Sequence, residues 1–257
     1  MTILRLAAAV VALAVAMHAP AAEPDAKSGE SRPFAVVELF TSEGCSSCPP
    51  ADEVAAKLAR SAESDGTDVY VLSFHVHYWD RLGWRDRFSS PEATGRQYRY
   101  SRVLTDDRTY TPQMVVNGTS GFVGSREQTA RREVAEALKV RPTHALQADA
   151  QVDGDTLRVS FRLAGPKPER GATVLVAIVE RSAKTDVKDG ENAGRSLTHA
   201  NVVRSFEEAD LGPSLGGELE LSLDGMKDRD GLRVIVVAQD ERSMAVLAAT
   251  ALDIPAE

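Results

Sequence analysis

Cysteine is scarce in this chain: its 257 residues include only two, Cys45 and Cys48. Two cysteines cannot build the disulfide framework by which small exported domains make up for a small core. They are more easily explained as a chemical site. Basic residues are not in excess either, since the formal net charge is −8 at pH 7. A nucleic-acid partner would need a basic face, so we expect no such partner.

A second long hydrophobic run is also missing. The single one, Leu6–Met17, follows Arg5 and is followed by the small residues 19–22. It is shorter than the ~20 residues of a membrane-spanning helix, and this order of features is typical of a signal peptide. We therefore predict a signal peptide over 1–22, a flexible polar tether over 23–32, and a periplasmic or secreted protein that does not span the membrane after cleavage. The alternative is an uncleaved anchor.

The two cysteines stand between a predicted strand and a predicted helix. Residues Phe34–Phe40 are mostly apolar over the length of a buried strand, and turn residues at 41–44 end the run. Two prolines follow Cys48, and they suit the first turn of a helix because no backbone N–H is needed there. The pattern places both thiols at a helix N-terminus.

A helix N-terminus favours thiol chemistry because its unpaired N–H groups and its dipole stabilise negative charge. Such a setting lowers the pKa of a cysteine from about 8.5 to roughly 3.5–7.5. We expect Cys45, on the loop side, to face solvent and act as the nucleophile. Cys48 would be the resolving thiol that attacks the mixed disulfide and releases the substrate. A static disulfide and half of a metal site are the alternatives.

Two segments resemble known redox proteins. Residues 38–48 resemble the strand, loop and helix of glutaredoxins and thioredoxins, and residues 111–118 resemble their cis-proline strand. Together with the segment Phe74–Trp79 and a β-rich tail, nearly all of the mature chain resembles a family of uncharacterised secreted thioredoxin-like proteins, a domain of unknown function with a Cys-Ser-Ser-Cys motif. The resemblance implies that the Thr111–Pro112 bond is cis, faces the thiols, and offers the Thr111 backbone to an extended substrate peptide.

A second strand is predicted over Asp68–Tyr78, where alternation places His75 and His77 on one face. If this strand lies beside the first, its carboxyl end opens on the edge that carries the cysteine loop. A lone histidine is more often structural than catalytic. We nevertheless take His77 as a candidate for lining the site and rank His75 below it.

An insertion relative to a minimal thioredoxin fold spans residues 79–108 and is rich in tryptophan, tyrosine and arginine. One interpretation is a helix that starts at Pro91, with Ser90 as its N-cap, and packs on the sheet through its aromatic residues. The other is a lid that presents arginine and indole surface to a substrate. The candidate substrate-binding residues are thus Thr111, Pro112, His77 and Trp79.

One departure from thioredoxin concerns a buried acid. Thioredoxins carry it six positions before the first active-site cysteine, and Leu39 occupies that position here. Glu38 stands one residue earlier, so alternation turns it to the other face. We expect Glu38 to be a paired structural carboxylate rather than the proton acceptor for Cys48.

The second half of the chain has the pattern of an all-β structure. Seven short strand-like runs lie between residues 144 and 251, separated by turn signals, which predicts a β-sandwich. This half shows no acid pair, nucleophile elbow or phosphate loop, so we interpret it as a partner-binding or packing domain. His199 and Arg204 are secondary site candidates. The residues expected to face inward are Leu157, Val159 and Phe161.

These observations predict an α/β thioredoxin-like domain over 33–142, followed by an all-β sandwich-like domain over 143–257. The predicted function is an exported thiol–disulfide oxidoreductase that needs no cofactor and exchanges with protein thiols or disulfides, or with a membrane electron donor. A metallochaperone that binds copper or zinc through Cys45, Cys48 and His77 is one alternative. A non-catalytic binding module is the other. The direction of electron flow depends on the three-dimensional site.

Overall fold

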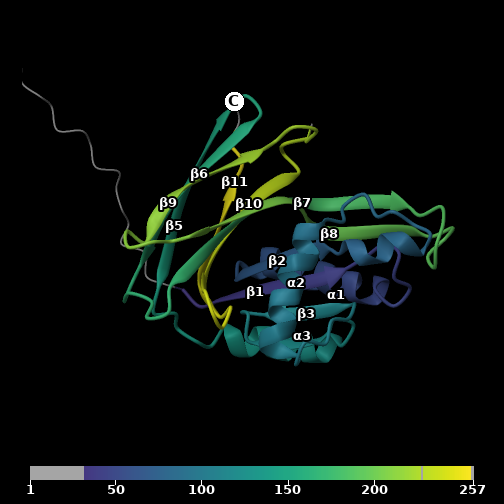
Figure 1. Ribbon diagram of the computed structural model, residues 1–257, viewed down its shortest axis with the longest axis horizontal. Coiled ribbons are helices and arrows are strands. Elements are labelled where there is room, and N and C mark those ends of the chain that lie inside the picture. The colour runs from purple at the N-terminus through teal and green to yellow at the C-terminus, as the bar shows by residue number, and fades with distance from the viewer. Residues whose placement is uncertain (1–31, 227, 256–257) are drawn as a thin grey trace, which may run out of the picture.

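The computed structural model describes residues 32–226 and 228–255. The signal peptide predicted over 1–22 lies outside the described residues, as does all but the last residue of the tether. In the described part of the chain, three α-helices and one short 3-10 helix accompany eleven strands (Figure 1). None of these helices is long and apolar enough to cross a membrane.

The first half of the chain mixes strands and helices, whereas the described second half is built of strands. The elements of the first half are β1 (Phe34–Thr41), α1 (Pro49–Asp65), β2 (Asp68–His75), η1 (His77–Leu82), α2 (Pro91–Leu104), β3 (Gln113–Val116), β4 (Ser120–Val123) and α3 (Glu127–Ala137). Those of the second half are β5 (Ala145–Asp153), β6 (Thr156–Ala164), β7 (Ala172–Asp186), β8 (Ser196–Asp210), β9 (Gly216–Ser222), β10 (Leu232–Asp240) and β11 (Val246–Asp253).

Eight of the strands form one mixed sheet in the order β11-β10-β7-β8-β2-β1-β3-β4. β1 pairs parallel with β2 and antiparallel with β3, and β2 meets β8 in parallel at the pair Ser73–Val202. The remaining strands, β5, β6 and β9, form a separate antiparallel sheet. Figure 1 shows β7 and β8, in green, as a long hairpin that runs from the side of this small sheet to the opposite side of the molecule.

This architecture shows that the predicted fold class is wrong. A thioredoxin-like α/β domain followed by an all-β sandwich-like domain would keep the two halves in separate sheets. Instead β7, β8, β10 and β11 extend the sheet of β1–β4. The physical reason is that β2 would otherwise expose an unpaired edge, and β8 covers it. The domain boundary at residues 142–143 stays a prediction, and strands from both sides of it share one sheet.

The individual strands of the second half were nevertheless predicted correctly. Each of the seven runs corresponds to one strand of β5–β11. Leu157, Val159 and Phe161 are buried, as the alternation in β6 predicts. Local pattern therefore located the strands but not their partners.

The helix starts also follow from local sequence. α1 begins directly after Cys48 with a proline in its first turn and ends at Gly66, which takes the left-handed conformation with φ 62°. The Ser90 side chain caps α2 by accepting a hydrogen bond from Ala93 N–H at 3.0 Å. α3 begins at Glu127 and ends at Ala137.

β2 ends three residues earlier than predicted. Its last residue is His75, and η1 begins at His77. The His77 N–H donates to Thr94 Oγ1 at 3.0 Å instead of joining a strand ladder. Since His77 no longer follows the strand alternation, the prediction that His75 and His77 share one strand face is wrong.

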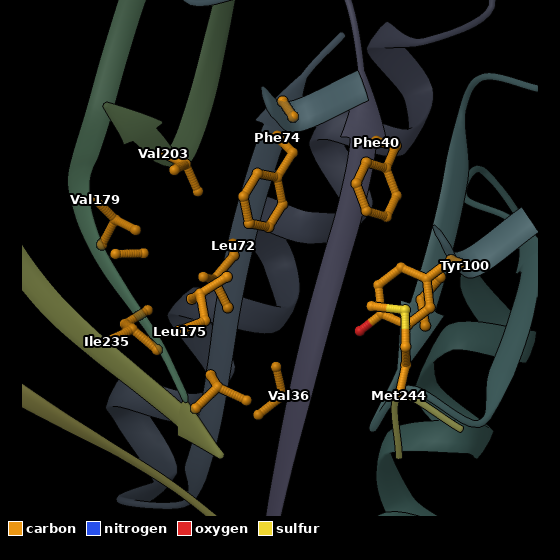
Figure 2. Close-up of a cluster of buried hydrophobic side chains, with 14 of the residues drawn as sticks. Val36, Phe40, Leu72, Phe74, Tyr100, Leu175, Val179, Val203, Ile235 and Met244 are labelled. Carbon is orange, nitrogen blue, oxygen red and sulfur yellow. The ribbon is translucent and has the colours of Figure 1, made fainter. Parts of the chain in front are cut away.

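The two halves of the chain share a hydrophobic core. Figure 2 shows Val36 and Phe40 of β1 beside Leu72 and Phe74 of β2, with Leu175 and other side chains from the β7, β8 and β10 strands on the far side of β2. A second core lies between the small sheet and β7, β10 and β11. Burial of this shared surface stabilises the eight-stranded arrangement.

A buried ion pair spans the first core. Arg96 of α2, 1% exposed, donates to Glu38 Oε2 from Nε at 2.6 Å and to Oε1 from Nη2 at 2.7 Å. Its Nη2 also donates to Gln239 Oε1 of β10 at 2.8 Å, and its Nη1 to Glu208 Oε1 of β8 at 2.6 Å. Tyr100 donates to Glu38 as well, at 2.6 Å. The expectation that Glu38 is a paired structural carboxylate is confirmed.

Arg96→Met should lower the free energy of unfolding by roughly 3–5 kcal/mol, because it leaves the Glu38 carboxylate buried without its cation. Arg99→Met is the matched control: Arg99 also pairs with Glu208, but its side chain is 38% exposed, so its loss should cost about 1 kcal/mol or less. Urea unfolding measures both. Equal losses in the two variants would contradict the structural role of the buried pair.

Candidate functional site

Cys45 and Cys48 are joined as a disulfide at the N-terminus of α1, with their Cα atoms 5.4 Å apart. Cys48 is the N-cap residue, and its carbonyl accepts hydrogen bonds from Ala51 N–H at 2.8 Å and Asp52 N–H at 3.1 Å. The predicted order of strand, loop and helix around the cysteines is confirmed. The disulfide therefore lies where a thiolate, once formed, would be stabilised by the helix.

Two of the predicted substrate-binding residues lie beside Cys45. The Thr111 hydroxyl donates to Cys45 Sγ at 3.4 Å and accepts from Trp79 Nε1 at 2.8 Å. The Thr111–Pro112 peptide bond is cis, as the resemblance implied, and Pro112 is buried. Ser47 Oγ is the other polar contact of Cys45 Sγ, at 3.3 Å.

Neither sulfur is accessible in this conformation. Cys45 and Cys48 are both 0% exposed, whereas the two serines between them are exposed. The expectation that Cys45 faces solvent is therefore wrong. A segment from the second half of the chain, residues 187–195 between β7 and β8, contacts the cysteine loop. We call this segment the cap.

Asn192 attaches the cap to the cysteine loop. It is 0% exposed, and its Nδ2 donates to Glu43 O at 2.8 Å and to Cys45 O at 3.0 Å. Its Oδ1 accepts from Arg195 at 2.8 Å, so the side chain is held at both ends. Glu191 adds an exposed contact by accepting from Ser46 N–H at 3.0 Å. The cap thus binds the cysteine loop through side chains of its own that contact backbone groups of the loop.

Gly190 lets the cap approach closely. Its φ is 74°, in the left-handed region, and a Cβ atom at this position would come within 3.0 Å of the Trp84 Cβ. Both conditions favour glycine.

Five ionisable side chains gather next to the cysteine loop, and we call them the charge cluster. Each is no more than 5% exposed. The His75 Nδ1 lies 2.6 Å from Asp86 Oδ2, which also accepts from Glu43 N–H at 2.9 Å. The His75 and His199 rings meet edge to face, with centroids 4.7 Å apart. The members of the charge cluster are Glu43, Asp52, His75, Asp86 and His199.

His199 bridges two carboxylates in this cluster. Its Nε2 lies 3.6 Å from Glu43 Oε1, and its Nδ1 lies 3.5 Å from Asp52 Oδ2. These distances are long for hydrogen bonds, so the attraction is mainly Coulombic. Burial lowers the pKa of His199, but the carboxylates of Asp52 and Glu43 outweigh it and raise that pKa to about 9. His199 is therefore a cation at neutral pH.

The pKa values of Glu43 and Asp86 are lowered, whereas that of His199 is raised. Burial raises the pKa of Glu43, but the contacts with His199 and with Trp84 Nε1, at 2.7 Å, leave that pKa below its ordinary value. Burial likewise raises the pKa of Asp86, and His75 more than offsets this. Both carboxyl groups are ionised at neutral pH. The charge cluster consequently holds opposite charges in contact, without solvent.

The ranking of the histidines from sequence was wrong. His77 is exposed, and its Nδ1 contacts Thr94 Oγ1 at 2.7 Å, while His75 lies in the charge cluster. Of the secondary candidates, His199 belongs to the cluster. Arg204 pairs with Glu180 and lies over the Phe88 ring at 5.5 Å.

Four residues of the candidate site were not predicted from the sequence: Glu43, Asp52, Asp86 and Asn192. Glu43 stands two positions before Cys45, and Asp52 stands four positions after Cys48, on the same face of α1. Both spacings were visible signals. Asn192 gave no local signal, because it meets the cysteine loop from 147 residues further along the chain.

The residues of the predicted alternative, a copper or zinc site of Cys45, Cys48 and His77, do not form a metal site. Across residues 32–226 and 228–255, no group of three or more histidine, cysteine, aspartate or glutamate side chains is placed to hold a metal ion. Cys45 and Cys48 are bonded to each other, and His77 contacts Thr94.

Fold and site together define a mostly β protein with an eight-stranded mixed sheet and a buried Cys-x-x-Cys disulfide. The chain belongs to the family described as "Protein of unknown function (DUF1223)", whose family model matches residues 36–239. That range includes the cysteine loop, the charge cluster and the cap. The description itself assigns no activity.

Solved and curated proteins show further similarity. A crystal structure from Agrobacterium tumefaciens is 28% identical, with a TM-score of 0.62, and the match covers 89% of this chain and 99% of that one. A domain of the outer membrane lipoprotein Omp28 from Porphyromonas gingivalis is 13% identical, with a TM-score of 0.27, over 44% of this chain and 88% of the domain. The C-terminal section of the carbamoyl phosphate synthase large chain from Methanopyrus kandleri is 27% identical over 139 residues, 49% of this chain but only 25% of that protein's length.

The raised pKa of His199 makes stability depend on pH. Because the folded-state pKa is about 9 and the ordinary value is 6.5, the stabilisation is fully present below about pH 6.5 and is lost as the pH rises through about 9. We expect a loss on the order of 3 kcal/mol between these limits. Urea unfolding at pH 6 and pH 10 measures it.

His199→Gln should remove most of this decline. His144→Gln should retain it, since His144 is also buried but contacts Thr143 and Pro166 instead of carboxylates. The same decline in the His199 variant would show that another group causes it.

Proposed function

We propose that the protein is a thiol–disulfide oxidoreductase whose redox centre is the Cys45–Cys48 pair. The observation that carries the proposal is the position of this disulfide at a helix start, with the Thr111 hydroxyl 3.4 Å from Cys45 Sγ and a buried charge cluster next to the cysteine loop. A disulfide between residues only three apart restricts the unfolded chain by no more than about 2 kcal/mol. A purely structural role would therefore explain little of this arrangement.

The reaction begins at Cys45. A donor thiolate attacks Cys45 Sγ, which forms a donor–Cys45 bond and breaks the Cys45–Cys48 bond, so the electron pair leaves on Cys48 Sγ. A second donor thiolate then attacks the donor sulfur of this mixed disulfide. The donor is released as a disulfide, Cys45 leaves as a thiolate, and the protein is reduced. In the reverse direction, the Cys45 thiolate attacks a substrate disulfide, and Cys48 resolves the adduct.

Access requires movement of the cap. Both sulfurs are 0% exposed, so a donor or substrate must first separate Asn192 from the carbonyls of Glu43 and Cys45. Thr111 contacts the sulfur of Cys45, Trp79 contacts Thr111, and these are the side chains that a substrate would meet next. We assign substrate contact to them and to Pro112, and not to His77.

The partners that suit this chemistry are protein thiols or disulfides, or a membrane electron donor. The N-terminal pattern of a charged residue, an apolar run and small residues supports export to the periplasm or beyond. Structural disulfides persist in such compartments, where enzymes that form or reduce them can act.

The Cys48→Ser variant should accumulate a mixed disulfide with its partner, because the resolving attack is missing. Cys45→Ser should trap nothing, since the attacked sulfur is gone. Acid quenching of cells that express the full chain, followed by non-reducing electrophoresis and mass spectrometry, shows the adducts. The proposal fails if Cys48→Ser traps no partner, or if both variants trap the same proteins equally.

The Asn192→Ala variant should react faster with dithiothreitol, by about tenfold or more, because the cap loses its two hydrogen bonds to the cysteine loop. Lys188→Ala changes an exposed cap residue and serves as the matched control, with an unchanged rate. Stopped-flow alkylation of the released thiols measures the rate in the folded protein. Equal rates in the wild type and in Asn192→Ala would contradict gating by the cap.

A further inference from the structure

The charge cluster contains proton-binding atoms that nothing in the described structure saturates. Both ring nitrogens of His199, Nε2 of His75 and Oε1 of Glu43 are buried without a hydrogen-bond partner among the described residues. The charge pairs of His199 with Glu43 and Asp52 offset part of the cost of burying these groups, but the missing hydrogen bonds leave a cost. Their presence at the cysteine loop therefore calls for a role beyond packing.

Reduction of the disulfide creates a negative charge that this cluster can neutralise. When the Cys45–Cys48 bond breaks, the electron pair remains on Cys48 Sγ. Cys48 is 0% exposed, so water does not solvate the thiolate. A buried anion must gain a proton or a nearby cation, because its desolvation is otherwise too unfavourable.

The geometry connects His199 to the side of α1 that carries Cys48. Asp52 lies one helical turn after Cys48, its N–H donates to Cys48 O at 3.1 Å, and both residues are buried. Asp52 Oδ1 accepts from Thr41 at 2.8 Å, which leaves Oδ2 to face His199 Nδ1 at 3.5 Å.

We propose that His199 is a positioning residue that stores the proton required by Cys48. As the Cys45–Cys48 bond breaks, the His199 imidazolium gives up one proton through Asp52, and Cys48 becomes a neutral thiol. When the disulfide re-forms, Cys48 returns that proton along the same path. The inference rests on the proposed function. It adds to that function the group that supplies the proton of the resolving thiol, Cys48.

The groups around His199 suit a stored proton. Asp52 faces it from α1, Glu43 from the cysteine loop, and His75 from β2, with Asp86 behind His75. Phe88 closes another side, its ring centroid 6.2 Å away, and the guanidinium groups of Arg87 and Arg204 lie over that ring. Carboxylates thus contact the imidazole directly, whereas the arginines are separated from it. Accordingly the pKa of His199 is raised to about 9 in the disulfide form.

The most direct test titrates the histidine itself. In the full chain, NMR of the imidazole nitrogens should show that the midpoint of His199 titration differs by at least one pH unit between the disulfide and dithiol forms, because proton binding is linked to reduction. His144 is the internal control and should titrate alike in both forms. An identical His199 midpoint in the two forms would overturn the inference.

The reduction equilibrium provides the second test. His199→Gln removes the stored proton, so the reduced form becomes less favourable, and the equilibrium constant with glutathione at pH 7 should move at least tenfold toward the disulfide, or about 30 mV. His144→Gln should stay within twofold of the wild type. If His199→Gln does not fold, the NMR titration of the wild type decides.

The two proposals fail differently. If the folded wild type does not exchange with glutathione at all, the proposed function is wrong, and the role of His199 is lost with it. If the wild type exchanges, but His199 titrates identically in both forms, only the role of His199 is wrong. A His199→Gln equilibrium constant within twofold of the wild type leads to the same conclusion.

Discussion

The site depends on the contact between β8 and β2. The strands meet in parallel at Ser73–Val202, and the Ser73 hydroxyl donates to Ala200 O at 2.8 Å. β8 carries His199, whose Nε2 lies 3.6 Å from Glu43 Oε1 of the cysteine loop, and β8 follows the cap, whose Asn192 donates to carbonyls of that loop. The buried ion pair of Arg96 with Glu38 and Glu208 holds the same two halves together further along. Without β8 the cysteine loop would keep its helix but lose its charge partner and its cover.

Burial places the disulfide in an environment that the protein determines, but it also keeps both sulfurs away from solvent. The cluster is buried, which strengthens its charge interactions, and a thiolate formed at the buried Cys48 would depend on a proton or a cation. Under the proposed function, the cap moves before a donor reaches Cys45. Because Asn192 binds backbone carbonyls and not the sulfurs, the cap can leave without changing the disulfide itself. Selection of partners would then depend on how well they replace these hydrogen bonds.

Local features of the chain were predictable, and long-range ones were not. The Ser90 N-cap of α2 and the helix after Cys48 each depend on neighbouring residues, and each is found. The preference for His77 over His75 assumed that the strand continues to its carboxyl end at Tyr78, whereas β2 ends at His75. The fold class was wrong because strand alternation does not reveal the partner of a strand, and β8 pairs with β2 across more than a hundred residues.

The reduction potential of the Cys45–Cys48 pair in the folded, full chain tests the account most directly. Structural disulfides of exported proteins have potentials below about −300 mV, and catalytic pairs lie above that value. Equilibration with glutathione buffers, followed by mass spectrometry of alkylated thiols, gives the potential. We predict a reversible two-electron transition above about −300 mV. A pair that stays oxidised until the protein unfolds would contradict a redox role and identify the disulfide as structural.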